Sequence, residues 1–143
     1  MNVPAANSEY LGSVELRIPS KPEWVAVARL TVAAIANRLP FSVEEIEDLK
    51  LAIAEACTNC IHHAVGGETI DLTFEADSSF LRIRVRDHGF GSRAEFGGAP
   101  KPRAVPPAEG LGIFLIQALM DHVEYNVDAQ SGTELVMTKR VGS

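Results

Sequence analysis

Residues 70–87 read IDLTFEADSSFLRIRVRD. Apolar and polar residues alternate with a period of two on both sides of the short Asp77-Ser78-Ser79 link, which predicts two strands joined by a hairpin turn. Such alternation places one face of each strand against a core and the other face in water, as is typical of antiparallel sheets. Parallel strands that are covered on both faces are apolar throughout. The stretch therefore predicts an antiparallel hairpin.

Helix and strand signals surround this hairpin. Ser20 and Ser42 each begin a capping box, with a glutamate three residues later, and each box predicts the start of a helix. The helices and strands make a two-layer α+β sandwich, with helices on one face of a mixed, mostly antiparallel sheet. In chain order we expect a strand at 14–18, helices at about 24–38 and 43–64, the hairpin, a loop at 88–110, a helix at about 112–120, and strands around 123–127 and 135–137.

The composition describes one ordinary folded domain. The chain has 143 residues, of which 46% are apolar, and a net charge of −6. This balance excludes a disordered chain. It also argues against direct nucleic-acid binding, because an acidic domain lacks the field that attracts phosphate backbones. Small phosphates stay possible, because backbone amides and a metal ion hold them locally.

Location is also indicated by the sequence. No run approaches the roughly 18 apolar residues that span a bilayer, so we expect no membrane segment. The first residues do not resemble a secretory signal. The two cysteines, Cys57 and Cys60, are therefore expected to be reduced thiols in a cytoplasmic protein.

The second predicted helix carries polar residues along one edge. On a helical wheel the core stripe contains Ile53, Ala56, Cys57 and Cys60, with Leu49 one turn and Ile46 two turns before Ile53. Glu55, Asn59 and His63 follow one another at four-residue intervals beside that stripe. They form either a solvated flank or one wall of a pocket. A zinc site made from Cys57, Cys60, His62 and His63 is disfavoured, because four ligands on one straight helix cannot converge on one ion.

Three further motifs follow in the chain, each weak by itself. Asp87-His88-Gly89-Phe90-Gly91 puts a carboxylate at the end of a strand, before backbone that a ligand can approach closely. Gly110-Leu111-Gly112 begins a helix, where exposed amides and the helix dipole favour an anion. Gly132-Thr133 begins the last strand, where the hydroxyl can point inward.

Taken in order, Glu55-x-x-x-Asn59, Asp87-x-Gly89-x-Gly91, Gly110-x-Gly112 and Gly132-Thr133 resemble the four nucleotide-binding boxes of the gyrase/Hsp90/histidine-kinase/MutL (GHKL) ATPase superfamily. Within it, Glu55-Ala56-Cys57-Thr58-Asn59 with the following His63-Ala64 is similar to the anti-sigma-factor serine kinases of bacterial partner-switching systems. The resemblance implies one histidine-kinase-like ATPase domain of the Bergerat type over residues 1–143, with a lid at about 92–109.

The resemblance implies a role for each matched residue. Glu55 would be the general base toward a substrate serine, and Asn59 would coordinate Mg²⁺ bridging the phosphates of ATP. Asp87 would accept a hydrogen bond from the adenine amino group, and Thr133 would assist through water. Asp48, Glu55 and Asp87 are expected to make the site acidic, so that ATP enters with Mg²⁺. The remaining nucleotide contacts would come from His63, Gly89, Gly91, Gly110, Leu111 and Gly112, with a basic group among Arg93, Lys101 and Arg103 reaching the γ-phosphate.

The resemblance favours an ATP-dependent protein serine kinase that is also an anti-sigma factor. It would phosphorylate a STAS-type anti-anti-sigma antagonist and sequester a sigma factor, and family members often form homodimers. One alternative is a nucleotide-loaded adaptor that switches partners without turnover. Another, ranked lowest, is the catalytic domain of a histidine kinase. The row of Arg82, Arg84 and Arg86 is either the solvent face of the sheet or a docking surface.

Overall fold

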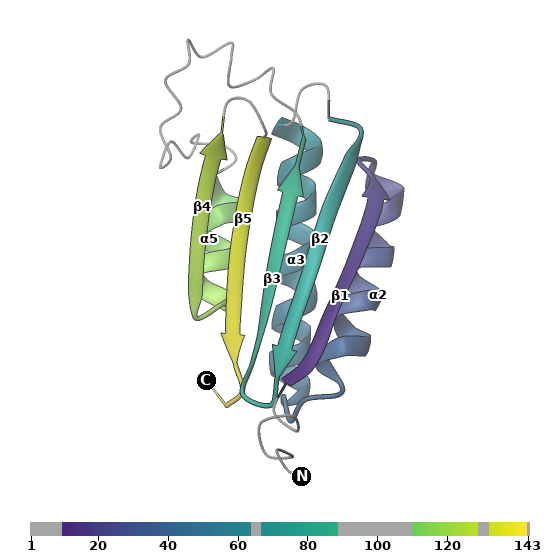
Figure 1. Cartoon of the computed structure of the whole chain (residues 1–143). Helices are drawn as coiled ribbons and strands as arrows, with labels where there is room; N and C mark the ends of the chain where they lie inside the picture. Colours follow the sequence, from purple (N-terminus) through teal and green to yellow (C-terminus); the bar gives the residue numbers. More distant parts are fainter. Residues whose placement is uncertain (1–9, 64–66, 89–109, 129–131, 143) are drawn as a thin grey trace.

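In the computed structural model, residues 10–63, 67–88, 110–128 and 132–142 are described. Within them, the chain alternates between a sheet and the helices that cover it (Figure 1). No helix of the described residues is long and apolar enough to cross a membrane. The elements are β1 (Tyr10–Pro19), the 3-10 helix η1 (Pro22–Trp24), α2 (Val25–Ala36), α3 (Val43–His63), β2 (Thr69–Asp77), β3 (Phe80–Asp87), α5 (Gly110–Leu119), β4 (His122–Asp128) and β5 (Gly132–Arg140).

The five strands form one sheet in the order β1-β2-β3-β5-β4. The predicted hairpin is confirmed: β2 and β3 pair antiparallel, and Asp77 accepts hydrogen bonds from the backbone amides of Ser79 and Phe80 in the turn. The two-layer α+β architecture is confirmed as well. The sheet is simpler than the mixed one that we expected, because each described pair of neighbouring strands is antiparallel.

The core lies between the sheet and the three α-helices, which all cover the same face (Figure 1). The alternation of residues 70–87 puts Leu72, Phe74 and Ile83 in this core, and burial of each such side chain contributes roughly 1.5–3 kcal/mol. The predicted stripe of α3 is confirmed, because Leu49, Ile53, Ala56, Cys57 and Cys60 are buried and Ile46 packs against them at the margin.

The two capping boxes have different outcomes. At Ser42 the box forms: the Glu45 backbone N–H donates to Ser42 Oγ at 3.0 Å, and the Ser42 N–H donates to Glu45 Oε1 at 2.7 Å. At Ser20 the prediction is wrong, because Lys21 is the N-cap of η1 and makes no side-chain capping bond. Pro22 follows at once, and the chain enters a 3-10 turn before α2 begins. Pro22 correctly marked the first helical turn, but Ser20 is not its N-cap.

Glu45 should make stability depend on pH. Its pKa is lowered from the ordinary value, mainly by the hydrogen bond from the Ser42 amide and also by one from the Gly142 amide. A depressed native pKa stabilises the fold above the unfolded-state pKa, and this contribution is lost as the pH falls through the native pKa. Glu45→Gln should lower the free energy of unfolding by about 1 kcal/mol at pH 7. In urea titrations this difference should shrink as the pH falls from the ordinary pKa of a glutamate through the lowered pKa of Glu45.

Glu44→Gln is the matched control, because Glu44 is the exposed neighbour in the same first helical turn. It should change stability by a few tenths of a kcal/mol at most. Equal losses for the two variants would mean that helix-dipole charge, rather than the capping box, carries the effect.

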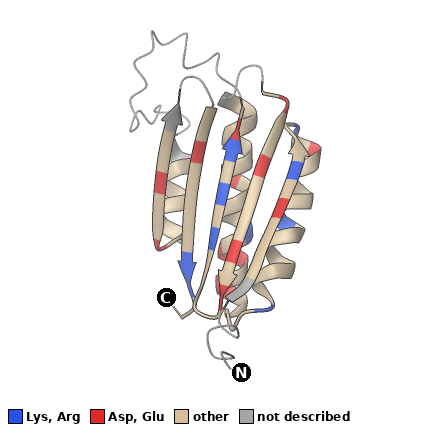
Figure 2. Cartoon of the chain, viewed as in Figure 1, with Lys and Arg blue, Asp and Glu red and all other residues tan. Residues whose placement is uncertain are grey.

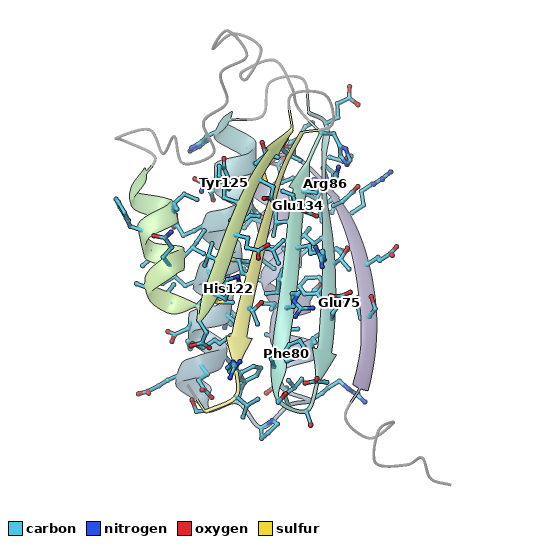
Figure 3. The ribbon with its side chains drawn as sticks, turned by 60° about the vertical axis from the view of Figure 1, so that its left-hand side comes forward. Glu75, Phe80, Arg86, His122, Tyr125 and Glu134 are labelled. Carbon is cyan, nitrogen blue, oxygen red and sulfur yellow. The ribbon has the colours of Figure 1, made fainter. Side chains whose placement is uncertain are left out.

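The face of the sheet away from the helices carries a ladder of opposite charges. Figure 2 shows basic bands along β3 with acidic bands on the neighbouring strands. Arg82 lies 3.5 Å from Glu75, and Arg84 and Arg86 each lie 3.8 Å from Glu134. Figure 3 shows Glu134 on β5 beside Arg86 on β3. Exposed pairs of this geometry add little stability. The arginine row lies on the solvent face of the sheet, where a docking surface stays an open alternative.

Candidate functional site

The predicted site residues come from four elements that meet at one end of the molecule. There β3 ends, β5 begins, α5 begins and α3 approaches its last turn (Figure 1). This placement follows from the topology, because antiparallel β3 and β5 bring the end of one strand beside the start of the other. The site therefore collects motifs that are separated by up to 78 positions, from Glu55 to Thr133.

Glu55 and Asn59 lie on α3 against the first turn of α5. A Cβ atom placed on Gly112 would lie 3.1 Å from Glu55 Oε1 and 3.2 Å from Asn59 Oδ1. The backbone of α5 thus approaches both side chains so closely that only glycine fits without a shift of its neighbours. Both side chains are half-buried. This edge of α3 is therefore partly covered by α5 and is not a fully solvated flank.

Asp87 lies at the end of β3, on the face of the sheet that the helices cover. It is only 4% exposed, and Oδ1 accepts a long 3.4 Å hydrogen bond from the backbone N–H of Thr133. Thr133 is buried beside it, as expected for a residue that points inward. Gly132 has φ +109°, and a Cβ there would lie 2.1 Å from the Asp87 carbonyl oxygen. A side chain at 132 is therefore excluded by both the backbone conformation and the space.

Cys60 links the Glu55–Asn59 pair to Asp87. It directly follows Asn59 on α3, and the charge of Asp87 acts on its thiol. Burial raises the pKa of Cys60 well above its ordinary value, and the negative charge of Asp87 adds to this shift. Burial also raises the pKa of Cys57 to about 12. Both thiols are free and buried, and no group of three His, Cys, Asp or Glu side chains in the described ranges could hold a metal ion.

The donors near Gly112 suit a magnesium ion better than a softer metal. Mg²⁺ prefers oxygen ligands, usually one or two protein oxygens together with phosphate oxygens and water. Asn59 Oδ1 is such an oxygen, and it lies beside the Gly112 backbone. The residues present therefore fit the predicted Mg²⁺, with the remaining ligands left to phosphate and water.

Several predicted residues lie partly or wholly outside the described chain. Gly110 and Leu111 begin α5, and His63 ends α3, but the side chains of Leu111 and His63 are not among those described. The remaining predictions fall between 89 and 109, outside the described residues: Gly89, Gly91, the lid at 92–109, and the candidate basic groups Arg93, Lys101 and Arg103.

Asp48 does not lie where it was expected, and the buried Lys139 was not predicted from the sequence. Asp48 was expected near the site, but it lies about 16 Å before Asn59 along α3 and 3.8 Å from Lys139 Nζ. Lys139 is buried at 5% exposure on the core face of β5 and was not singled out from the sequence. The period-two pattern contains the signal, because Lys139 continues the buried positions Leu135 and Met137.

Comparisons with known proteins agree on one family. The family model described as "Histidine kinase-like ATPase domain" matches residues 18–139. A serine-protein kinase RsbW of Halalkalibacterium halodurans is 43% identical over 135 residues, which cover 89% of this chain and 82% of the relative. Proteins of the same name from Bacillus cereus and Bacillus anthracis are 38% identical over 142 residues, which cover 93% of this chain and 88% of each relative.

Proposed function

The chain belongs to the histidine kinase-like ATPase family, among the serine-protein kinases named RsbW, and from this premise we infer that it is an ATP-dependent protein serine kinase and anti-sigma factor. One observation carries the inference. The Gly112 backbone lies against both Glu55 and Asn59, so a phosphate at the start of α5 would be within reach of a metal ligand and a base. The adaptor alternative is not favoured, because relatives covering most of the chain are named as kinases.

Asp87 provides the adenine end of the proposed nucleotide site. Its buried carboxylate is an acceptor, and the exocyclic amino group of adenine is a donor that guanine lacks at that position. Thr133 lies beside Asp87 and can hold a bridging water with its hydroxyl. Burial and the charge of Asp87 raise the pKa of the Cys60 thiol, so this thiol stays protonated. This end of the site would select the base and position the nucleotide.

The start of α5 provides the phosphate end. The amides of Gly110, Leu111 and Gly112 are in the first turn, where helix N–H groups have no partner within the helix and the dipole favours an anion. Asn59, which lies beside the Gly112 backbone, would hold Mg²⁺. Magnesium, when bound, neutralises phosphate charge in a domain whose own net charge is −6.

Glu55 would act on the protein substrate. As the serine oxygen attacks the γ-phosphorus, the bond from that phosphorus to the β–γ bridging oxygen breaks and ADP leaves. The Glu55 carboxylate accepts the proton of the serine hydroxyl. Most of the catalysis in such a transfer is positioning and charge stabilisation. The contact between Gly112 and Glu55 would fix the base relative to the phosphates.

The proposal extends to partners and organisation. The substrate would be a STAS-type anti-anti-sigma factor, and the sequestered partner a sigma factor, so control of transcription would not require contact with DNA. We further propose a single ATPase domain over residues 1–143 with a lid at about 92–109, a homodimer, and a cytoplasmic location, where ATP is available and Cys57 and Cys60 stay reduced.

The test is incubation of the purified chain with ATP, Mg²⁺ and the purified STAS protein. Mass spectrometry should find phosphoserine on the STAS protein, and omission of Mg²⁺ should abolish it. Tight binding of the STAS protein and of ATP without any phosphoserine would contradict the kinase proposal and leave the adaptor.

Gly112→Ala tests the geometry of the site separately from the stability of α5. A Cβ at 112 would push Glu55 Oε1 or Asn59 Oδ1 by a few tenths of an ångström. We expect phosphoserine formation to slow about tenfold, because small misplacements of reacting groups are costly. The melting temperature should stay level or rise, because alanine stabilises a helix by up to about 1 kcal/mol relative to glycine. Full activity together with a raised melting temperature would show that the close approach is not needed.

A further inference from the structure

Lys139 is a charged side chain on the buried face of β5. Its side chain is 6% exposed, and it continues the row of Leu135 and Met137 beneath the helices. A lysine is rarely buried without partners, because removal of its charge from water is costly. The contacts of Lys139 therefore indicate what it does.

Those contacts connect three elements. Lys139 Nζ donates a 2.8 Å hydrogen bond to the carbonyl oxygen of Leu119, the last residue of α5. It also lies 3.8 Å from Asp48 Oδ2 on α3. Its charge reaches Glu45 in the first turn of α3 and helps to lower the pKa of that carboxyl. A cation at the carboxyl end of α5 complements the helix dipole, so Lys139 links α5 and α3 to β5.

Further bonds attach the same end of α5 to β5. The backbone N–H of Arg140 donates to Asp121 Oδ2 at 2.7 Å, and the Asp121 N–H donates to the Thr138 carbonyl at 2.9 Å. The carboxyl end of α5 is thus fixed by neighbouring residues of one strand. The helix then extends about 15 Å to its first residue, Gly110.

We propose that Lys139 is a positioning residue for nucleotide binding. By fixing Leu119, it sets the position of α5 along α3 and so aligns Gly112 with Glu55 and Asn59 at the opposite end of the helix. Lys139 touches no substrate in this proposal. The inference rests on the proposed function, because it assumes that the start of α5 binds the phosphates of ATP.

The experiment compares two ligands on Lys139→Met. Methionine keeps the length and the packing of the side chain but removes the donor and the charge. Mg²⁺–ATP should bind about tenfold more weakly by calorimetry, because its phosphates depend on the alignment of α5. Adenosine, which has no phosphates and would contact Asp87 on β3, should keep its affinity within about twofold. A loss of folded protein would weaken both ligands by the same factor.

Three further variants complete the design. Lys50→Met removes a half-buried lysine of α3 that pairs with the exposed Glu47, and it should leave both affinities unchanged. Lys139→Arg keeps a charged donor and should recover most of the affinity for ATP. If Lys139→Met does not fold by circular dichroism, Lys139→Gln, which keeps a donor for Leu119, takes its place with a smaller selective loss.

The outcomes are distinguishable. A selective loss of ATP affinity supports the proposal, whereas parallel losses or unchanged affinities overturn it. If the unaltered protein binds no Mg²⁺–ATP, the proposed function fails instead, whatever the variants do.

Discussion

Replacing Glu55 with glutamine is expected to reduce phosphoserine formation by a factor of about 10²–10⁴, because the carboxamide cannot accept the proton of the substrate hydroxyl. The same variant should still bind Mg²⁺–ATP within a fewfold of the unaltered protein, since Glu55 is not placed at the adenine end. The neutral side chain has almost the shape of the original, so the contact with Gly112 is retained. Single-turnover phosphorylation of the STAS protein, with ATP affinity measured by calorimetry, gives both quantities.

Glu47→Gln is the matched control for this substitution. Glu47 lies two turns earlier on the same helix, is exposed, and pairs with Lys50. It should leave the rate unchanged, so that a lower rate in Glu55→Gln is assigned to position rather than to the loss of one charge. If Glu55→Gln phosphorylates at the normal rate, another group is the base and the role of Glu55 is refuted.

Replacing Asp87 with asparagine is expected to weaken ATP binding by about 100-fold. An amide can present its N–H₂ to the adenine amino group, and removal of a hydrogen bond to a buried charged group costs about 1.5–3 kcal/mol. Discrimination against GTP should fall as well, because an amide donor suits the guanine carbonyl. Titration calorimetry with ATP and GTP measures both effects.

Asp71→Asn is the matched control. It tests whether the weaker ATP binding depends on the position of the carboxylate that is lost. Asp71 lies on β2 and faces away from the helices, where it pairs with Arg17 at 2.6 Å. The pair is exposed, so its loss should cost little stability and should not change nucleotide affinity. An Asp87 variant that kept its preference for ATP over GTP would contradict the proposed adenine contact.

Much of the fold could be predicted because local patterns agree with the final packing. The alternation in 70–87 gave the hairpin directly, and the Ser42–Glu45 box correctly located the start of α3. The Ser20 box has the same two-residue signal as the Ser42 box, but there the cap is Lys21 and Pro22 begins a 3-10 turn. The purely antiparallel sheet could not be predicted, because strand order depends on contacts between residues distant in sequence.

The residues of the candidate site could be proposed from the sequence, but their arrangement in space could not. Motif order placed Glu55, Asn59, Asp87 and Thr133 in one region, and the structure brings them to one end of the sheet. Only packing revealed that Gly112 touches Glu55 and Asn59. Asp48 was misplaced because helical spacing gives the direction of a side chain but not its distance from a site. Lys139 was missed because a lysine at the end of a strand usually points into water.

The strand order has a consequence for how the chain can fold and vary. β3 and β5 are neighbours, yet 44 residues lie between Asp87 at the end of β3 and Gly132 at the start of β5. Their pairing must close a large loop, whereas β2 and β3 close a minimal one, so the hairpin can nucleate early and β5 must join late. Closure entropy grows only with the logarithm of loop length, and doubling the loop costs about 0.6 kcal/mol. The segment between β3 and α5 can therefore gain or lose residues at little thermodynamic expense, which leaves its length open to selection for function.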